Sequence, residues 1–318
     1  MRIAIVGIGD IAEKAYLPIL TQLEEVELVF CTRNKMTLQR LAKQYHIKQV
    51  YQDYRQLSHV NVDAVMIHSS TASHLEIASF FLQLGVPTFV DKPLADNAFD
   101  CEKIYELAQK QQQPLYMGFN RRFIPLYKRY FGDPQSTLPD TSLLSLRWEK
   151  NRHNLPGDIR KVIFDDFIHP LDSVNLCAKS NLEDVHLSSQ FKGTQLARID
   201  VQWQDGNMLL HASMNRLHGI THERVSVGFE NRAYEFDSFM TGKCLQDKQT
   251  FLLQLKDWTP MLTAKGFTAM IADWINVVKS GQMKQSVIER NLSTHQLAEA
   301  VCQKVQTKLS GSEQKRRY

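Results

Sequence analysis

Cysteine is scarce in this chain of 318 residues. The five cysteines are Cys31, Cys101, Cys177, Cys244 and Cys302. Their number is odd and no Cys-x-x-Cys pair occurs, which argues against a disulfide framework and against a zinc site. We therefore expect no metal centre. Scattered thiols that stay reduced are typical of a cytoplasmic protein.

Long apolar runs are also missing. No stretch approaches the roughly 18 apolar residues that a membrane-spanning helix needs, so no membrane partner is expected. The first residues enter a strand pattern at once, so we expect no signal peptide. The net charge of +4 is small, which argues against the basic surface of a nucleic-acid-binding protein. An apolar content of 43% and a charged content of 23% are typical of a globular enzyme.

An acidic residue is absent after the second predicted strand, which covers residues 26–31. The chain continues there with Thr32, Arg33 and Asn34. A fold that prefers NAD usually has an acid at this point, to bind the ribose 2′-hydroxyl. A hydroxyl, a guanidinium and an amide suit a 2′-phosphate instead, because charge-assisted hydrogen bonds to phosphate are strong. These residues therefore predict a preference for NADP; the alternative is a solvated basic loop.

A glycine-rich turn lies at the start of the chain. An apolar strand pattern leads directly into Gly-x-Gly-x-x-Ala, formed by Gly7, Gly9 and Ala12. The first glycine allows a tight turn, the second lets a pyrophosphate approach the backbone, and the alanine lets the next helix pack closely. The N-terminus of that helix offers free N–H groups to phosphate. The turn, with Asp10 and Ile11 inside it, predicts a dinucleotide site rather than a tight turn alone.

Strand and helix patterns alternate up to residue 120, which predicts a doubly wound parallel sheet. The strands are expected at residues 3–6, 26–31, 64–67, 86–90 and 115–118, and the helices at 12–23, 36–45, from 73, and 98–111. Beyond residue 120, strands follow one another, which is typical of an antiparallel sheet. They are expected at 143–148, 185–191, 197–203, 208–214, 224–229 and 232–236, before helices near 267–279 and 294–309. We predict an α/β domain over 1–120 and an α+β domain with an open sheet over 121–318.

Polar side chains follow two of the buried strands. Ser69, Ser70, Thr71 and His74 come after one, and Asp91-Lys92-Pro93 comes after the next. Ligands of open α/β sheets bind at the carboxyl ends of the strands, so we expect these groups beside the cofactor. The hydroxyls are equally suited to capping the next helix, and the lysine equally to the surface.

Three further polar residues share a predicted helix. Asp165 and His169 are four residues apart and Asp172 is three further on, which places them near one helical face. A carboxylate beside an imidazole fixes its tautomer and supports proton transfer. The alternative is an acidic first helical turn with a structural histidine.

Together these motifs resemble the Gfo/Idh/MocA oxidoreductase family, and most closely its MviM-like subgroup. The glycine turn, Ser69–His74, Asp91-Lys92-Pro93, the junction segment Met117–Phe123 and Asp165-x-x-x-His169 carry the resemblance. The chain departs from the family in three ways. An aspartate replaces the usual Glu of Glu-Lys-Pro, no Gly-Gly precedes the catalytic pair, and the extra Asp166 leaves open which carboxylate meets the imidazole.

The resemblance implies a Rossmann domain that binds NADP, with NAD as the alternative, and a second domain that binds substrate. It implies hydride transfer at a carbinol or ketone carbon of a sugar, cyclitol or polyol. Lys92 would polarise the substrate oxygen, His169 would be the general acid/base, and Asp165 would orient it. Asp91 and Asn120 join the expected cofactor-binding residues.

The resemblance also implies that the second sheet joins subunits into a homodimer or larger oligomer. Trp203, Leu210 and Met214 are the side chains we expect on its exposed apolar face. The alternative function is a non-catalytic nucleotide-binding sensor on the same fold; the intact glycine turn argues against a pure scaffold. The residues leave the substrate, the reaction direction and the oligomer size open.

Overall fold

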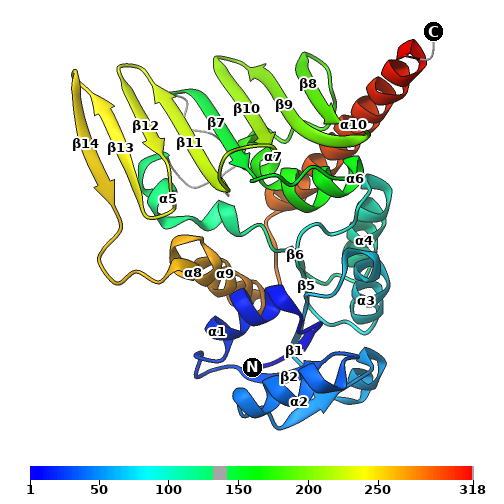
Figure 1. Cartoon of the computed structure of the whole chain (residues 1–318). Helices are drawn as coiled ribbons and strands as arrows, with labels where there is room; N and C mark the ends of the chain where they lie inside the picture. Colours follow the sequence, from blue (N-terminus) through cyan, green and yellow to red (C-terminus); the bar gives the residue numbers. More distant parts are fainter. Residues whose placement is uncertain (132–141, 317–318) are drawn as a thin grey trace. The chain divides into compact units, whose positions relative to one another are not determined.

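The computed structural model describes residues 1–131 and 142–316 (Figure 1). The chain divides into two compact units. The first contains Met1–Asn120 and Phe267–Lys284, and the second contains Arg121–Gly266 and the chain from Gln285 onward. The sequence predicted one boundary at residue 120 and placed the whole remainder in the second domain. Residues 267–284 instead return to the first unit.

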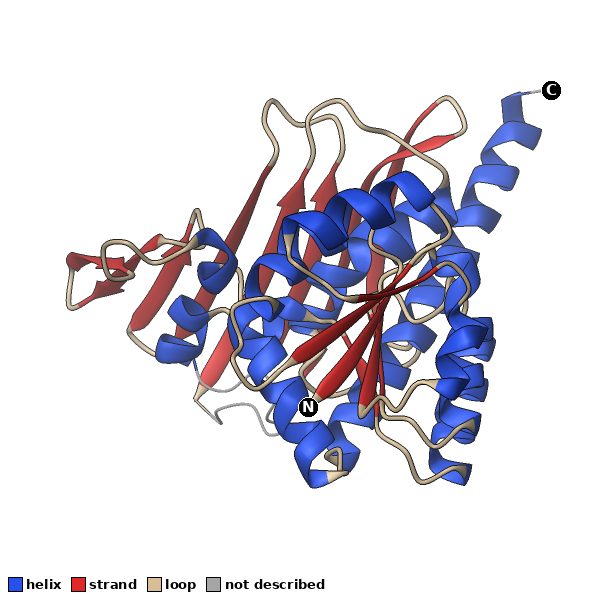
Figure 2. Cartoon of the chain, turned by 90° about the horizontal axis from the view of Figure 1, so that it is seen from below, coloured by secondary structure: helices blue, strands red, loops and turns tan. Residues whose placement is uncertain are grey.

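The first unit is built on a six-stranded, fully parallel sheet of order β3-β2-β1-β4-β5-β6. The strands are β1 (Arg2–Val6), β2 (Glu27–Cys31), β3 (Gln49–Tyr51), β4 (Ala64–Ile67), β5 (Thr88–Val90) and β6 (Leu115–Met117). The main helices are α1 (Leu17–Leu20), α2 (Lys35–Gln44), α3 (Thr71–Gln83) and α4 (Ala98–Lys110). Helices flank the sheet on both faces (Figure 2). The predicted doubly wound fold is confirmed, with the strand order reversing beside β1.

The helix after β1 differs from the continuous one predicted over 12–23. Ala12–Tyr16 forms wide π-helical turns, and α1 follows. Pro18 has no N–H to donate to the carbonyl four residues earlier, so the regular α-helical ladder cannot continue through it. The wide turns bury the Tyr16 ring completely.

Helix α9 (Phe267–Ser280) completes the core of the first unit. Its Trp274 ring lies 5.9 Å from that of Phe89 and 5.5 Å from that of Tyr116. The Tyr116 hydroxyl also donates a hydrogen bond of 2.8 Å to Asp273. A buried tryptophan removes a large apolar area from water. The pairing of α9 with β5 and β6 is therefore a substantial part of this core.

The second unit contains an eight-stranded sheet of order β14-β13-β12-β11-β7-β10-β9-β8, seen side by side in Figure 1. The strands are β7 (Leu143–Asn151), β8 (Val185–Lys192), β9 (Gln195–Asp205), β10 (Met208–Asn215), β11 (His222–Phe229), β12 (Arg232–Phe236), β13 (Thr241–Gln246) and β14 (Gln249–Gln254). All neighbours are antiparallel except β7 and β10. The predicted open, mostly antiparallel sheet is confirmed.

The second unit also contains five α-helices among its described residues. They are α5 (Pro125–Phe131), α6 (Ile159–Lys161), α7 (Ile168–Val174), α8 (Met261–Ala264) and α10 (Gln285–Arg316). Helix α7 packs on β7 and β10, and α10 packs on α7. No helix within the two described ranges is long and apolar enough to cross a membrane.

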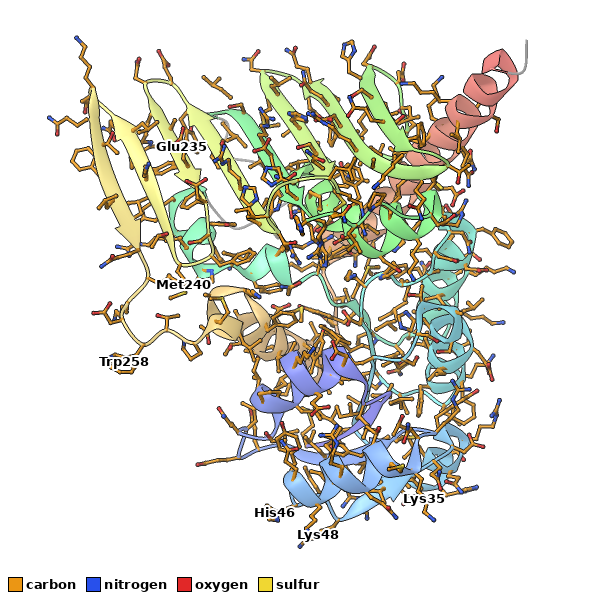
Figure 3. All side chains as sticks on the ribbon, in the orientation of Figure 1. Lys35, His46, Lys48, Glu235, Met240 and Trp258 are labelled. Carbon is orange, nitrogen blue, oxygen red and sulfur yellow. The ribbon has the colours of Figure 1, made fainter. Side chains whose placement is uncertain are left out.

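Three apolar side chains that were expected on the exposed face of the sheet are buried, which corrects one prediction. Trp203, Leu210 and Met214 are buried, with at most 2% of their surface exposed. They lie on the covered face, because strand alternation separates two faces without saying which one is covered. Large apolar side chains are exposed at Leu144 on β7, at Leu209 on β10, on the edge strand β14, and in the loop after β14, where Trp258 is 99% exposed (Figure 3).

Candidate active site

The glycine turn after β1 has the geometry that a dinucleotide site requires. Gly7 has φ +86°, and a Cβ there would lie 2.5 Å from the backbone nitrogen of Ser69. A Cβ on Gly9 would meet nothing within 4 Å. Ala12 is fully buried, and the exposed Asp10 and Ile11 lie between. The turn therefore leaves open space at the position where the motif predicts the pyrophosphate, so the residues present suit a nicotinamide dinucleotide.

The serine-rich loop after β4 lies against this turn. Ser70 is the N-cap residue of α3, but its side chain makes no capping hydrogen bond. The hydroxyl of Ser73 bonds Ser69 Oγ and the Ser70 carbonyl, both at 2.8 Å. Capping thus does not occupy the Ser70 hydroxyl, and Ser70 and Thr71 remain at the carboxyl edge of the sheet.

His74 connects the loops that follow β4 and β5. Its Nδ1 lies 2.9 Å from the Pro93 carbonyl oxygen, and its Nε2 lies 3.0 Å from the Ser69 carbonyl oxygen. The residue is 2% exposed. The ring therefore holds the Lys92-Pro93 segment beside the serine loop.

Asp91 is also held inside the fold. Its Oδ1 accepts the Tyr16 hydroxyl at 3.1 Å and the Lys92 N–H at 2.8 Å. Burial raises the pKa of this carboxyl above its ordinary value. The Tyr16 ring in turn lies 3.9 Å from that of His68, and burial lowers the pKa of His68 to about 3. Sequence reasoning missed Tyr16 and His68, because both lie within apolar stretches that read as core.

The loop after β2 offers a free cation. Asn34 caps α2, its Oδ1 accepting the Thr37 N–H at 3.0 Å. Arg33 is exposed, and no residue of the described ranges forms an ion pair with its guanidinium. Lys35 also projects outward from the start of α2 (Figure 3). The loop can therefore present positive charge to a ligand.

The segment that carries the predicted catalytic pair is not one regular helix. Val162–Phe167 forms π-helical turns between α6 and α7. His169 is 5% exposed at the start of α7. Such turns are frequent at functional sites. They also change the angular spacing that α-helical periodicity assumes between Asp165 and His169.

Asp172 lies three residues after His169 in α7, as predicted, and its carboxylate forms a buried ion pair. Arg122 binds both of its carboxylate oxygens, and the Thr294 hydroxyl donates to Oδ1 at 3.1 Å. Arg290 donates to its backbone carbonyl at 2.6 Å. Burial raises the pKa of Asp172, and the two arginines more than offset this, so the pKa lies below its ordinary value. Asp172 thus anchors α7.

Asp166 is occupied by three cations. Lys150 Nζ lies 2.6 Å from Oδ1, and Arg152 donates to Oδ2 at 2.8 Å and to Oδ1 at 2.6 Å. Arg216 donates to Oδ2 at 2.5 Å. Both oxygens of Asp166 are therefore bound by cations. One pattern in the sequence could have indicated Lys150 and Arg152. They continue the every-second-residue spacing of the buried side of β7.

The junction residues divide between the two units. Asn120 is buried at the end of the first unit, where its N–H donates to the Gly118 carbonyl at 3.0 Å. Arg121 begins the second unit and forms a two-point ion pair with Glu223. Trp148 donates to the same glutamate at 3.1 Å. Each unit thus carries its own part of the predicted site.

Comparison with known proteins decides the family. A family model described as "Oxidoreductase family, NAD-binding Rossmann fold" matches residues 1–119. A solved Gfo/Idh/MocA family oxidoreductase from Vibrio cholerae is 54% identical, with 98% of this chain and 99% of that chain covered and a TM-score of 0.95. The chain belongs to the Gfo/Idh/MocA family. The resemblance read from the motifs is confirmed.

Two further proteins refine this placement. A solved MviM dehydrogenase from Clostridium difficile is 27% identical over 97% of this chain and 99% of that chain, with a TM-score of 0.85. The myo-inositol 2-dehydrogenase of Thermotoga maritima is 29% identical over 131 residues, which are 41% of this chain and 39% of that protein. The chain is thus a member of an oxidoreductase family whose N-terminal fold binds NAD.

Proposed function

We propose that this protein is an NADP-preferring dehydrogenase or reductase that acts on a carbinol or ketone carbon of a sugar, cyclitol or polyol. The observation that carries the proposal is the open space at Gly9, at the carboxyl end of β1, where the strand order reverses. The similarity to an inositol dehydrogenase supports the substrate class.

The first unit would hold the cofactor. We assign the pyrophosphate to the turn from Gly7 to Ala12, including Asp10 and Ile11, and assign Ser69, Ser70, Thr71 and Asn120 to further cofactor contacts. The exposed Arg33, with Thr32 and Asn34, would bind the 2′-phosphate through charge-assisted hydrogen bonds. Asp91 and His74 would act by holding Lys92 and its loop in place.

The chemistry requires one charge and one proton carrier from this chain. The nicotinamide supplies a hydride acceptor or donor when it is bound. As the substrate C–H bond breaks with its electron pair, a proton must leave the hydroxyl oxygen, and His169 would accept it. Lys92 would stabilise the alkoxide charge that develops on that oxygen. Asp165 would orient the imidazole, because cations already occupy both oxygens of Asp166.

The surroundings of His169 suit a precise proton carrier. The residue is 5% exposed and lies three positions before Asp172, whose buried ion pair anchors α7. A catalytic group needs a fixed position to act efficiently. The anchored helix would supply that position without using His169 itself.

The test follows the reduced cofactor while purified protein is incubated with NADP⁺ or NAD⁺ and a panel of sugars, cyclitols and polyols. His169→Ala and Lys92→Ala should each lower turnover by roughly 10²–10⁴-fold, the usual range for acid–base catalysis. NADPH affinity should stay within a few-fold of wild type. The matched controls are His186→Ala on β8 and Lys110→Ala on α4, two exposed residues that should leave turnover unchanged.

Two outcomes would contradict the proposal. Wild-type turnover by His169→Ala would mean that the proton leaves by another group. No turnover with any member of the panel, together with normal NADPH binding, would favour a nucleotide-binding sensor.

A further inference from the structure

Three cations share one buried carboxylate in the second unit. Lys150 and Arg152 on and just after β7, and Arg216 after β10, all bind Asp166. Lys150 also donates to the Asp166 backbone carbonyl at 3.2 Å. We call these four residues the Asp166 cluster. Its members come from three separate elements. Asp166 itself belongs to the segment that leads to His169.

The Asp166 cluster contains more basic than acidic side chains. Three basic side chains face one carboxylate, and two of them, Arg152 and Arg216, are arginines. The neighbouring pair of Arg121 and Glu223 is neutral by itself. One carboxylate shared by three basic groups leaves their charge only partly compensated, and a bound anion would add a second counterion. Burial, and next the charge of Arg121, lower the pKa of Lys150 to about 7.

Hydrogen-bond donors remain available in the cluster. The Arg152 guanidinium uses Nε and one terminal nitrogen on Asp166, which leaves its other terminal nitrogen without a partner among the described residues. Its side chain is 32% exposed, against 3% for Lys150. Lys150 has three N–H donors, and its two contacts with Asp166 use two of them. Arg152 is thus the accessible member of the cluster.

We propose that the substrate carries an anionic substituent, a carboxylate or a phosphate ester, which Arg152 and Lys150 bind. This rests on the proposed function. Asp166 precedes His169 by three residues in the same buried segment. An anion bound beside Asp166 would therefore fix the substrate relative to the proton carrier. Asp166 would hold the cations in position and would not itself touch the substrate.

The experiment compares matched pairs of ligands. Glucose is paired with glucuronate and with glucose 6-phosphate, and myo-inositol with an inositol monophosphate. Binding is measured by calorimetry with and without NADP⁺, so that it depends neither on turnover nor on the cofactor site. The anionic member of at least one pair should bind wild-type protein at least tenfold more tightly than its neutral parent. The pair that responds distinguishes a carboxylate from a phosphate.

The decisive variant is Arg152→Gln. It removes the accessible cation and leaves Lys150 and Arg216 on Asp166, so the protein should still fold. Anion affinity should fall by roughly 10–100-fold, as for loss of a charge-assisted hydrogen bond, while a neutral parent should be affected less than threefold. Where turnover is found, KM for the anionic substrate should rise more than kcat falls. The matched control is Arg198→Gln, which removes an arginine from the exposed face of the sheet, where it pairs with Asp200.

The outcomes separate this inference from the proposed function. Equal or weaker binding of the anionic member in every pair, including no binding, would overturn the inference. Turnover of a neutral sugar would then leave the proposed function standing. An equal loss of anion binding in Arg198→Gln would show that general charge is responsible and would also overturn it. Failure to bind NADP⁺ and NAD⁺, with anion preference intact, would overturn the proposed function and would leave Arg152 as an anion-binding residue that serves no hydride transfer.

Discussion

Gly7 and Gly9 share one turn, but a methyl group added to each is expected to have a different effect. At Gly7 it should lower stability, and at Gly9 it should weaken cofactor binding. At Gly7 the new Cβ would lie 2.5 Å from Ser69 N, 2.7 Å from Ser69 Cα and 2.8 Å from the His68 carbonyl carbon. These are backbone atoms, which cannot rotate away as a side chain can. At Gly9 the Cβ would meet nothing within 4 Å.

The magnitudes follow from these distances. Gly7 has φ +86°, and a left-handed conformation costs an alanine about 1–2 kcal/mol. Overpacking adds about 1–3 kcal/mol, so Gly7→Ala should lower the free energy of unfolding by about 2–5 kcal/mol. Gly9→Ala should change it by less than about 1 kcal/mol, because the unfolded chain alone is affected.

Cofactor binding should respond in the opposite order. The Gly9 methyl group would occupy space assigned to the pyrophosphate, at a cost of about 1–3 kcal/mol, or roughly 5–150-fold in affinity. Gly9→Val should abolish binding in a folded protein. Urea denaturation gives the stability of each variant from its midpoint at constant m, and NADPH titration gives its affinity.

Either of two results would refute the reasoning. A wild-type urea midpoint for Gly7→Ala would mean that the turn relaxes around the new methyl group. Wild-type NADPH affinity in Gly9→Val would mean that the cofactor binds elsewhere.

Three further predictions concern cofactor choice, stability and assembly. Arg33→Ala should weaken NADPH binding by about 1.5–3 kcal/mol and leave NADH binding unchanged in fluorescence titrations; an equal effect on both would contradict the assigned 2′-phosphate site. Asp172→Asn should destabilise the protein by about 3–5 kcal/mol in urea denaturation, because Arg122 and Arg290 lose their buried counterion. Since the pKa of Asp172 is lowered in the folded protein, its contribution is present above the unfolded pKa and lost as pH falls through the folded pKa. The wild-type urea midpoint should therefore fall in acid more than that of the variant, and equal falls would count against this. The protein should sediment as a homodimer or larger at micromolar concentration, because exposed apolar side chains on β14 and after it favour an interface; a clean monomer would be the contrary result.

Local patterns were enough to predict most of the fold. Alternating strands and helices predicted the parallel sheet, and consecutive strands predicted the antiparallel one. Strands β13 and β14 were missed because β14 is exposed on both faces, which removes the alternation that marks a strand. Strand β3 was missed because it has only three residues and no buried apolar run.

The site residues that belong to a local motif could be predicted from the sequence. Those whose contacts come from distant parts of the chain could not. The glycine turn could be read from Gly7 and Gly9 alone. The ion pairs of Asp166 and Asp172 could not be predicted, because their arginine partners lie far away in the sequence. The π-helical turns before His169 also break the spacing that was assumed. Helical periodicity orients a residue only within a regular helix.

The return of α9 to the first unit has a consequence for the order of folding during synthesis. The ribosome completes β6 long before it makes α9, and the whole eight-stranded sheet emerges in between. Until then, the surface of Phe89 and Tyr116 that Trp274 will cover has no partner from α9. Exposed apolar surface of this kind makes a nascent chain prone to aggregation. The first unit should therefore reach its final stability only after residue 284 has emerged. Stable folding of the N-terminal part of the chain thus depends on residues made near its end.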